Sequence, residues 1–160
     1  HATTAMCLRW LEHIVCPQMR VYDVGCGSGI LAIAASKLGA GEVIAMDYDP
    51  VAVSVAEENV RANNVTNVAV FESDLLSICA GTEPAELITA NIIADIIIRL
   101  FDQLDRHLAP GGILLASGII DDRIVDVERA ATEHGYTVLD MTCEKEWAAM
   151  IIRRSSELKL

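Results

Sequence analysis

A glycine-rich segment with the sequence DVGCGSG, at residues 23–29, constrains the fold of this chain more than any other feature. Its first two residues end a short apolar run at residues 20–24, and its last glycine precedes a helix-like apolar pattern, so the chain must turn sharply there. Glycine permits such a turn, and its missing side chain lets a ligand approach the backbone. Three alternating glycines exceed what a plain turn needs, which predicts a nucleotide-like ligand beside the first strand of an α/β sheet.

Short apolar runs alternate with helix-like patterns along the rest of the chain. The expected strands lie at residues 20–24, 42–47, 68–71, 87–90, 113–116, 136–141 and 147–152. The expected helices lie at residues 4–15, 30–38, from Pro50 to about residue 60, 93–108 and 120–131. The last two strands are too close for a helical crossover, so they predict an antiparallel hairpin at the sheet edge. This order predicts a doubly wound, Rossmann-like α/β domain with a seven-stranded, mostly parallel sheet.

Composition agrees with one such domain over residues 1–160. Apolar residues make up 52% of the chain and aromatic residues only 4%, so Ala, Val, Ile and Leu must form the core, as in buried parallel sheets. No apolar run reaches the roughly 18 residues of a membrane span, and residues 1–15 lack a signal-peptide pattern. The net charge of −11 argues against direct nucleic-acid binding. We therefore expect a cytoplasmic protein without a membrane or nucleic-acid partner.

Neither the cysteines nor the acidic residues show the spacing of a metal site, so no metal is predicted. The five cysteines are scattered without a Cys-x-x-Cys pair, which is typical of small buried residues in a reducing compartment. The acidic residues at positions 121, 122, 126 and 128 are expected on a solvated helix face rather than in a metal site.

The glycine spacing distinguishes between two cofactor classes. A dinucleotide fingerprint reads Gly-x-Gly-x-x-Gly. Here the glycines stand at Gly25, Gly27 and Gly29, and Ile30 occupies the position of the third fingerprint glycine. The loop of S-adenosylmethionine-dependent methyltransferases has this tighter spacing, with an acid two residues before its first glycine, here Asp23. The sequence therefore predicts S-adenosylmethionine as cofactor, with Asp23, Gly25 and Gly27 among its binding residues.

Acidic residues follow the second and third strands. Asp47 ends the second strand about 20 residues after the loop, where an acid accepts hydrogen bonds from ribose hydroxyls. It is also a possible helix cap, but Asp49, directly before Pro50, is better placed for that role. Tyr48 is predicted along the adenine, with an ordinary surface aromatic almost equally compatible. Asp74 is a candidate acceptor for the adenine amino group, and a loop or cap role fits it equally well.

Four segments in order resemble the PrmA family, which methylates ribosomal protein L11. They are HATT at residues 1–4, DVGCGSGILAIA at 23–34, NIIA at 91–94 and EKEW at 144–147, so the resemblance covers essentially the whole chain. It implies a class I methyltransferase that methylates lysine side chains and the N-terminal amine of a ribosomal protein. Its cofactor contacts fall on Thr4, Gly25, Asp47 and Asn91. From the residues alone, Thr3 or Thr4 is equally compatible with a cap of the leading helix.

Asn91 is the predicted catalytic residue. It ends the fourth expected strand, where its amide oxygen is placed to accept a hydrogen bond from a substrate amine. The alternative is a structural Asn that satisfies its own loop backbone. Related amide-nitrogen methyltransferases carry Asn-Pro-Pro-Tyr or Asp-Pro-Pro-Tyr here, whereas this chain reads Asn-Ile-Ile-Ala, which points away from an amide substrate.

The chain departs from the family pattern at its start. Family members usually carry Gly-Thr-Gly before the histidine that corresponds to His1, and full-length members carry a small N-terminal domain that docks the ribosomal protein. The sequence is therefore predicted to comprise the methyltransferase domain alone. Two alternatives stay open, namely a methyltransferase of the same fold with another substrate and a non-catalytic S-adenosylmethionine-binding domain. The oligomeric state is not predicted.

Overall fold

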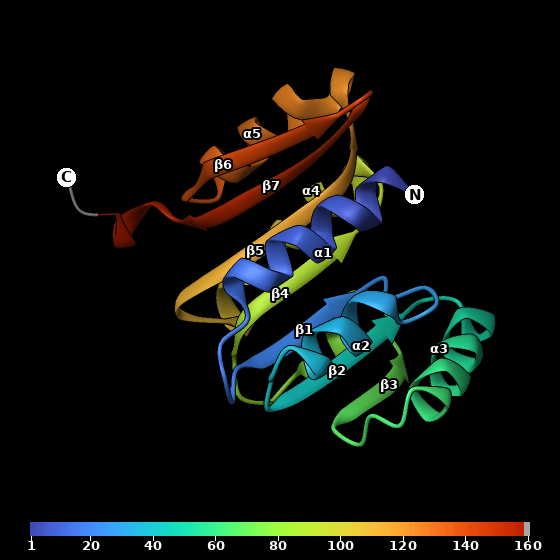
Figure 1. The fold of residues 1–160 in the computed structure, drawn as a ribbon. Helices are drawn as coiled ribbons and strands as arrows, with labels where there is room; N and C mark the ends of the chain where they lie inside the picture. The colour runs from blue at the N-terminus through green and yellow to red at the C-terminus, as the bar shows by residue number, and fades with distance from the viewer. Residues whose placement is uncertain (159–160) are drawn as a thin grey trace.

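A computed structural model describes residues 1–158 as three layers, with a central sheet between two layers of helices (Figure 1). One face carries the helices α1 (Ala2–Ile14), α2 (Ile30–Lys37) and α3 (Pro50–Ala62), and the other carries α4 (Ala94–His107) and α5 (Ile124–Glu133). The strands are β1 (Arg20–Val24), β2 (Glu42–Asp47), β3 (Val68–Glu72), β4 (Ala85–Asn91), β5 (Leu108–Ile120), β6 (Tyr136–Glu144) and β7 (Trp147–Arg154).

The strand order confirms the predicted fold class. The sheet runs β3-β2-β1-β4-β5-β7-β6, in which β1 to β5 are parallel and β7 is antiparallel to both β5 and β6. The order reverses between β1 and β4, because the chain returns to the middle of the sheet after β3. In open α/β sheets this reversal leaves a crevice at the carboxyl ends of the strands, where ligands bind.

Side chains alternate between the two faces of each central strand and build one apolar cluster on each face. Val21 of β1 and Leu115 of β5 pack with α1 and α2, whereas Tyr22 and Leu114 pack with α4 and α5. All four side chains are almost completely buried. Both faces of β1 and β5 are therefore covered, which explains their near-continuous apolar sequence.

The structure corrects two boundaries. Leu108, expected at the end of a helix, instead begins β5 opposite Ala85, and the pairing with β4 resumes only at Ile113, so the Pro-Gly-Gly segment at residues 110–112 is an irregularity within the strand. Ile120, which helical spacing assigned to a helix, instead ends β5 opposite Trp147, and α5 begins only at Ile124. In both places strand pairing with a distant segment outweighs the local sequence pattern.

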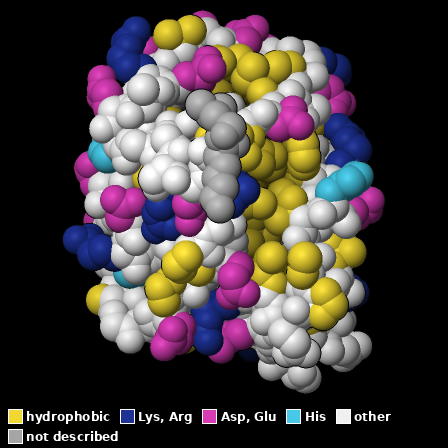
Figure 2. Space-filling view, turned by 90° about the vertical axis from the view of Figure 1, so that its left-hand side faces the viewer, with side chains coloured by type: hydrophobic (Ala, Val, Ile, Leu, Met, Phe, Trp, Pro, Cys, Tyr) yellow, Lys and Arg dark blue, Asp and Glu magenta, His cyan; other side chains and the backbone are white. Residues whose placement is uncertain are grey.

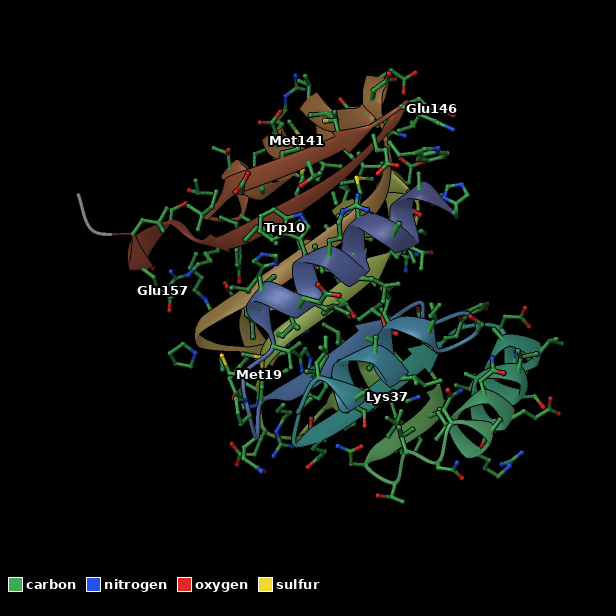
Figure 3. All side chains as sticks on the ribbon, in the orientation of Figure 1. Trp10, Met19, Lys37, Met141, Glu146 and Glu157 are labelled. Carbon is green, nitrogen blue, oxygen red and sulfur yellow. The ribbon has the colours of Figure 1, made fainter. Side chains whose placement is uncertain are left out.

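The hairpin of β6 and β7 is tied to α1. The Trp10 indole N–H donates to the Thr142 hydroxyl oxygen at 2.8 Å, and Arg9 forms an exposed ion pair with Glu144 at 2.8 Å. Figure 3 shows Trp10 between α1 and the hairpin, with Glu146 at the hairpin turn beside the start of α1. The start of α1 and this turn thus lie at the same end of the molecule as the carboxyl ends of the parallel strands (Figure 1).

The opposite end of the molecule has a different character. Figure 2 shows a band of hydrophobic side chains there, with Lys and Arg side chains dispersed among Asp and Glu rather than gathered into a basic patch. Within residues 1–158, none of the helices has the length and apolar character needed to cross a membrane.

Candidate functional site

A cavity of about 460 Å³ lies at the carboxyl ends of the central strands, where the reversal of strand order predicts a ligand site. Its volume falls within the range of about 300–1,000 Å³ that is typical of small-molecule sites. The residues that line it come from the ends of β1, β2, β3 and β4 and from the first turns of α4: Val24, Gly25, Met46, Asp47, Tyr48, Ser73, Asp74, Leu75, Ile92, Ile96 and Arg99.

The glycine loop contributes backbone rather than side chains to this site. Gly25 lines the cavity with a φ of +67°, and a Cβ atom there would collide with the Cγ2 methyl of Ile92. Packing against Ile92 therefore requires glycine at this position, whether or not a ligand is bound. At Gly27, in contrast, a Cβ atom would meet no atom within 4 Å, so this part of the loop is open to a ligand.

Asp47 connects the glycine loop to the end of β2. One carboxylate oxygen, Oδ2, accepts a hydrogen bond from the Gly27 N–H at 2.9 Å, and the other, Oδ1, accepts from the Asp49 N–H at 3.0 Å. Asp49 caps α3 by accepting from the Val51 N–H at 2.9 Å, so the alternative that Asp47 caps this helix is wrong. Each Asp47 oxygen keeps a second lone pair, which leaves the carboxylate able to accept hydrogen bonds from a diol.

Tyr48 and Asp74 lie on the rim of the same cavity. The Tyr48 side chain is 77% exposed, which leaves its ring face free to stack on a flat ligand. Asp74 carries a loose ion pair with Arg99, with 3.5 Å between carboxylate and guanidinium and more than half of each side chain exposed. The structure therefore brings together four of the predicted residues, Gly25, Asp47, Tyr48 and Asp74, around one cavity.

Asp23 is placed differently from the other acids, because it is buried beneath the loop rather than in the cavity lining. Its Oδ1 accepts from the Thr89 hydroxyl at 2.7 Å, whereas Oδ2 is buried with no hydrogen-bond partner among residues 1–158. Burial raises the pKa of Asp23 to about 7, although the hydrogen bond from the Thr89 hydroxyl favours the charged form. The site thus contains a buried acceptor whose capacity is unmet by the protein.

Burial of Asp23 predicts that this residue lowers stability as the pH rises. Its folded-state pKa of about 7 lies above the unfolded value, so between about pH 4 and 7 the folded state keeps a proton that the unfolded state has lost. Rising pH therefore favours unfolding in that window. Asp23→Asn, which preserves the bond from Thr89, should raise the melting temperature at pH 8 by about 3 °C or more. Thermal denaturation at pH 5.5 and pH 8 measures this gain.

The gain from Asp23→Asn should be smaller at pH 5.5, where less of the penalty has developed. Asp122→Asn is the matched control, because it removes the same charge from an exposed side chain. A gain of the same size at both pH values, or in both variants, would contradict the assigned cause.

Thr4 and Asn91 lie outside the cavity lining, toward β5. Thr4 is half-buried in the first turn of α1, and His1 rather than either threonine caps this helix by accepting from the Thr3 N–H. The alternative of a threonine cap is therefore wrong. Asn91 is half-buried at the end of β4, opposite Ser117 of β5.

Sequence reasoning missed several residues of the site. Ile92, Ile96 and Arg99 line the cavity, yet the spacing of the isoleucines indicated only a helix. The Ser-Gly pair at residues 117–118 interrupts an apolar strand. Glycine within a strand pattern is a signal for a bulge, and this signal could have identified the pair.

Among residues 1–158, no three His, Cys, Asp or Glu side chains are grouped to hold a metal ion.

Solved structures identify the class of this fold. The ribosomal protein L11 methylase of Lactobacillus delbrueckii subsp. bulgaricus aligns with a TM-score of 0.90 and 36% identity, over 96% of this chain and 79% of that chain. A structure complexed with S-adenosylhomocysteine aligns with a TM-score of 0.80 over 95% of this chain and 49% of that chain, and its 12% identity supports the fold alone. The strand order, the glycine loop and the cavity beside it define a Rossmann-like, class I methyltransferase domain.

Sequence comparison identifies the family. The profile of ribosomal protein L11 methyltransferases (PrmA) matches residues 1–155. A ribosomal protein L11 methyltransferase of Caldanaerobacter subterraneus subsp. tengcongensis is 51% identical over 154 residues, which are 96% of this chain and 49% of that protein. The chain belongs to the PrmA family, a family of S-adenosylmethionine-dependent proteins, so the resemblance inferred from its sequence is confirmed. The chain spans about half the length of the curated relatives that it matches.

Proposed function

We propose that this chain is the catalytic part of an S-adenosylmethionine-dependent protein N-methyltransferase. Its substrates would be amino groups of ribosomal protein L11, on lysine side chains and the N-terminal amine. The observation that carries the proposal is the Asp47 carboxylate, which joins the open Gly27 loop to the cavity and keeps lone pairs for a ribose. Membership of the PrmA family supports the methyl transfer and the substrate.

The adenosine half of the cofactor is assigned to the cavity. Asp47 would accept hydrogen bonds from both ribose hydroxyls, Tyr48 would stack along the adenine, and Asp74 would accept from the adenine amino group. The open space at Gly27 fits a ligand that crosses the loop. Asp23, buried beneath the loop, would support the loop rather than contact that ligand. The methionine half would then extend past Gly25, and its carboxylate would accept from the Thr4 hydroxyl.

Asn91 is assigned the role of orienting the amine. S-adenosylmethionine supplies an electrophilic methyl group when bound, so the protein has mainly to align the reactants and exclude water. The Asn91 Oδ1 atom would accept one N–H of the neutral amine and direct the nitrogen lone pair toward the methyl group. A lysine amine has an ordinary pKa of about 10.4, so its proton must leave first, and we assign that proton to water rather than to a dedicated base.

Methylation of purified ribosomal protein L11 with labelled S-adenosylmethionine tests this function. We expect label to enter L11 on lysine side chains and the N-terminal amine, located by mass spectrometry. Calorimetry with S-adenosylhomocysteine measures binding separately. Binding without transfer would support the alternative of a non-catalytic cofactor-binding domain, and transfer only to other acceptors would refute the substrate.

The additional length of the relatives bears on how the substrate is recognised. Because this chain spans about half of them, we propose that docking of L11 depends on the other half, as the family resemblance implies. The chain alone should then transfer methyl groups to L11 more slowly than a full-length relative.

A cytoplasmic location follows from a ribosomal protein substrate and belongs to the same proposal.

A further inference from the structure

A bulge interrupts β5 next to the proposed catalytic residue. Ser117 pairs with Ala149 of β7 and Ile119 pairs with Ala148, so Gly118 is an extra residue between two paired ones. Gly118 has a φ of +80°, a conformation that side-chain-bearing residues rarely adopt. We define Ser117 and Gly118 as the β5 bulge. Such bulges bend a strand locally and change where its neighbours point.

The β5 bulge contacts the segment that carries Asn91. The Ile92 N–H donates to the Ser117 carbonyl oxygen at 3.1 Å. A Cβ atom on Gly118 would lie 2.8 Å from the Ile92 carbonyl oxygen and 3.1 Å from Asn91 Oδ1. On its other side, the Ile92 side chain lies against Gly25 so closely that a Cβ atom there would collide with it. Ile92 is therefore packed between a glycine of β5 and a glycine of the cofactor loop.

The same bulge also contacts the first turn of α1. The Ser117 hydroxyl donates to the Thr3 carbonyl oxygen at 3.5 Å, a long hydrogen bond between two buried residues. Ser117 is fully buried, and the Thr3 side chain is 5% exposed. Thr4, the residue assigned to the methionine carboxylate, directly follows this contact. One element of β5 thus touches both segments on which the methionine half of the cofactor depends.

We infer that the β5 bulge is a positioning element that sets Asn91 and the first turn of α1 relative to each other for the methionine half of S-adenosylmethionine. This inference rests on the proposed function, because it assumes the assigned cofactor orientation. Ser117 and Gly118 act through Asn91, Ile92 and Thr4 and need not touch the cofactor. The adenosine half, assigned to Asp47 and the cavity, should be independent of them.

Two ligands separate the halves of the cofactor. S-adenosylhomocysteine carries both the adenosine and the amino-acid half. 5′-Methylthioadenosine carries the adenosine but lacks the amino-acid half. We expect Gly118→Ala to weaken S-adenosylhomocysteine binding about tenfold or more, with 5′-methylthioadenosine affinity within twofold of the unaltered chain. Gly135→Ala is the matched control, since Gly135 has a φ of +82° but open space around it. It should lose thermal stability from the same backbone strain while binding both ligands normally.

Ser117→Ala is a milder second variant in case Gly118→Ala does not fold, because it removes only the hydroxyl. It should weaken S-adenosylhomocysteine binding about threefold and leave 5′-methylthioadenosine binding unchanged. Equal losses for both ligands, or no loss in either variant, would overturn the inference. If the unaltered chain bound neither ligand, the proposed function itself would fail, so the two failures are distinguishable.

Amide hydrogen exchange gives a readout that needs no ligand. The Ile92 N–H should exchange faster in Gly118→Ala than in Gly135→Ala, because only the former disturbs its bond to Ser117. Equal protection of Ile92 in the two variants would overturn the inference.

Discussion

Asn91→Ala is expected to lower methyl transfer about 100-fold or more while S-adenosylhomocysteine binding falls less than fivefold. The reason is geometric, since a misaligned nucleophile costs rate out of proportion to its effect on binding. Asn91 ends β4 opposite Ser117, beside the loop that carries the open Gly27 position. Initial rates on ribosomal protein L11, combined with calorimetry on the same variant, separate the two effects.

Asn63→Ala is a suitable control for the loss of an amide side chain. Asn63 follows α3, and its exposed amide donates to the Asn59 carbonyl, away from the cavity. This variant should retain both transfer and binding. Retention of full turnover by Asn91→Ala would contradict the proposed catalytic role. A parallel loss of rate and affinity would assign Asn91 to cofactor binding alone.

Asp47→Ala should weaken S-adenosylhomocysteine binding about 100-fold. Two hydrogen bonds from ribose hydroxyls to a carboxylate, at about 1.5 kcal/mol each, sum to about 3 kcal/mol, and each 1.4 kcal/mol is tenfold in affinity. The substitution also removes the acceptor of the Gly27 N–H, so the loop loses a bond that shapes its open face. Calorimetry with S-adenosylhomocysteine and 5′-methylthioadenosine should show similar losses for both, because both carry the ribose.

Asp49→Ala is the matched control for Asp47→Ala. It removes a carboxylate two residues away, and the cap of α3 with it, which should cost about 1 kcal/mol of folding free energy. The Asp49 backbone N–H that bonds Asp47 remains in this variant. We therefore expect a lower melting temperature with unchanged affinity. Unchanged affinity in Asp47→Ala would refute the ribose role.

Local patterns predicted the elements well wherever a residue's neighbours in sequence decide its conformation. The predicted boundaries of β1 and β2 match the structure, and α3 begins at Pro50 after an Asp49 cap, as expected. The errors fall where a distant strand decides the conformation, as at Leu108 and Ile120 of β5. Hydrogen bonds to β4 and β7 extend β5 at both ends, and no local signal reports them.

The candidate site shows the same division. Gly25, Asp47, Tyr48 and Asp74 were predictable, because the residues just after parallel strands meet at one edge of the sheet. Asp23 was predicted as a cofactor residue from its place in the loop motif, but only the structure shows that it is buried, with a pKa raised to about 7.

The sequence by itself determined the fold class and the cofactor class, because glycine spacing, strand-end acids and apolar periodicity are local properties. The family followed from the resemblance of four short segments to PrmA proteins. Only the tertiary structure decided how those parts meet. Ile92 lies between Gly25 and Gly118, and Ser117 contacts Thr3 across 114 positions of sequence. Such contacts depend on strand register and on a bulge. Both bring together segments that are far apart in the chain, so the sequence of any one segment gives almost no signal of them.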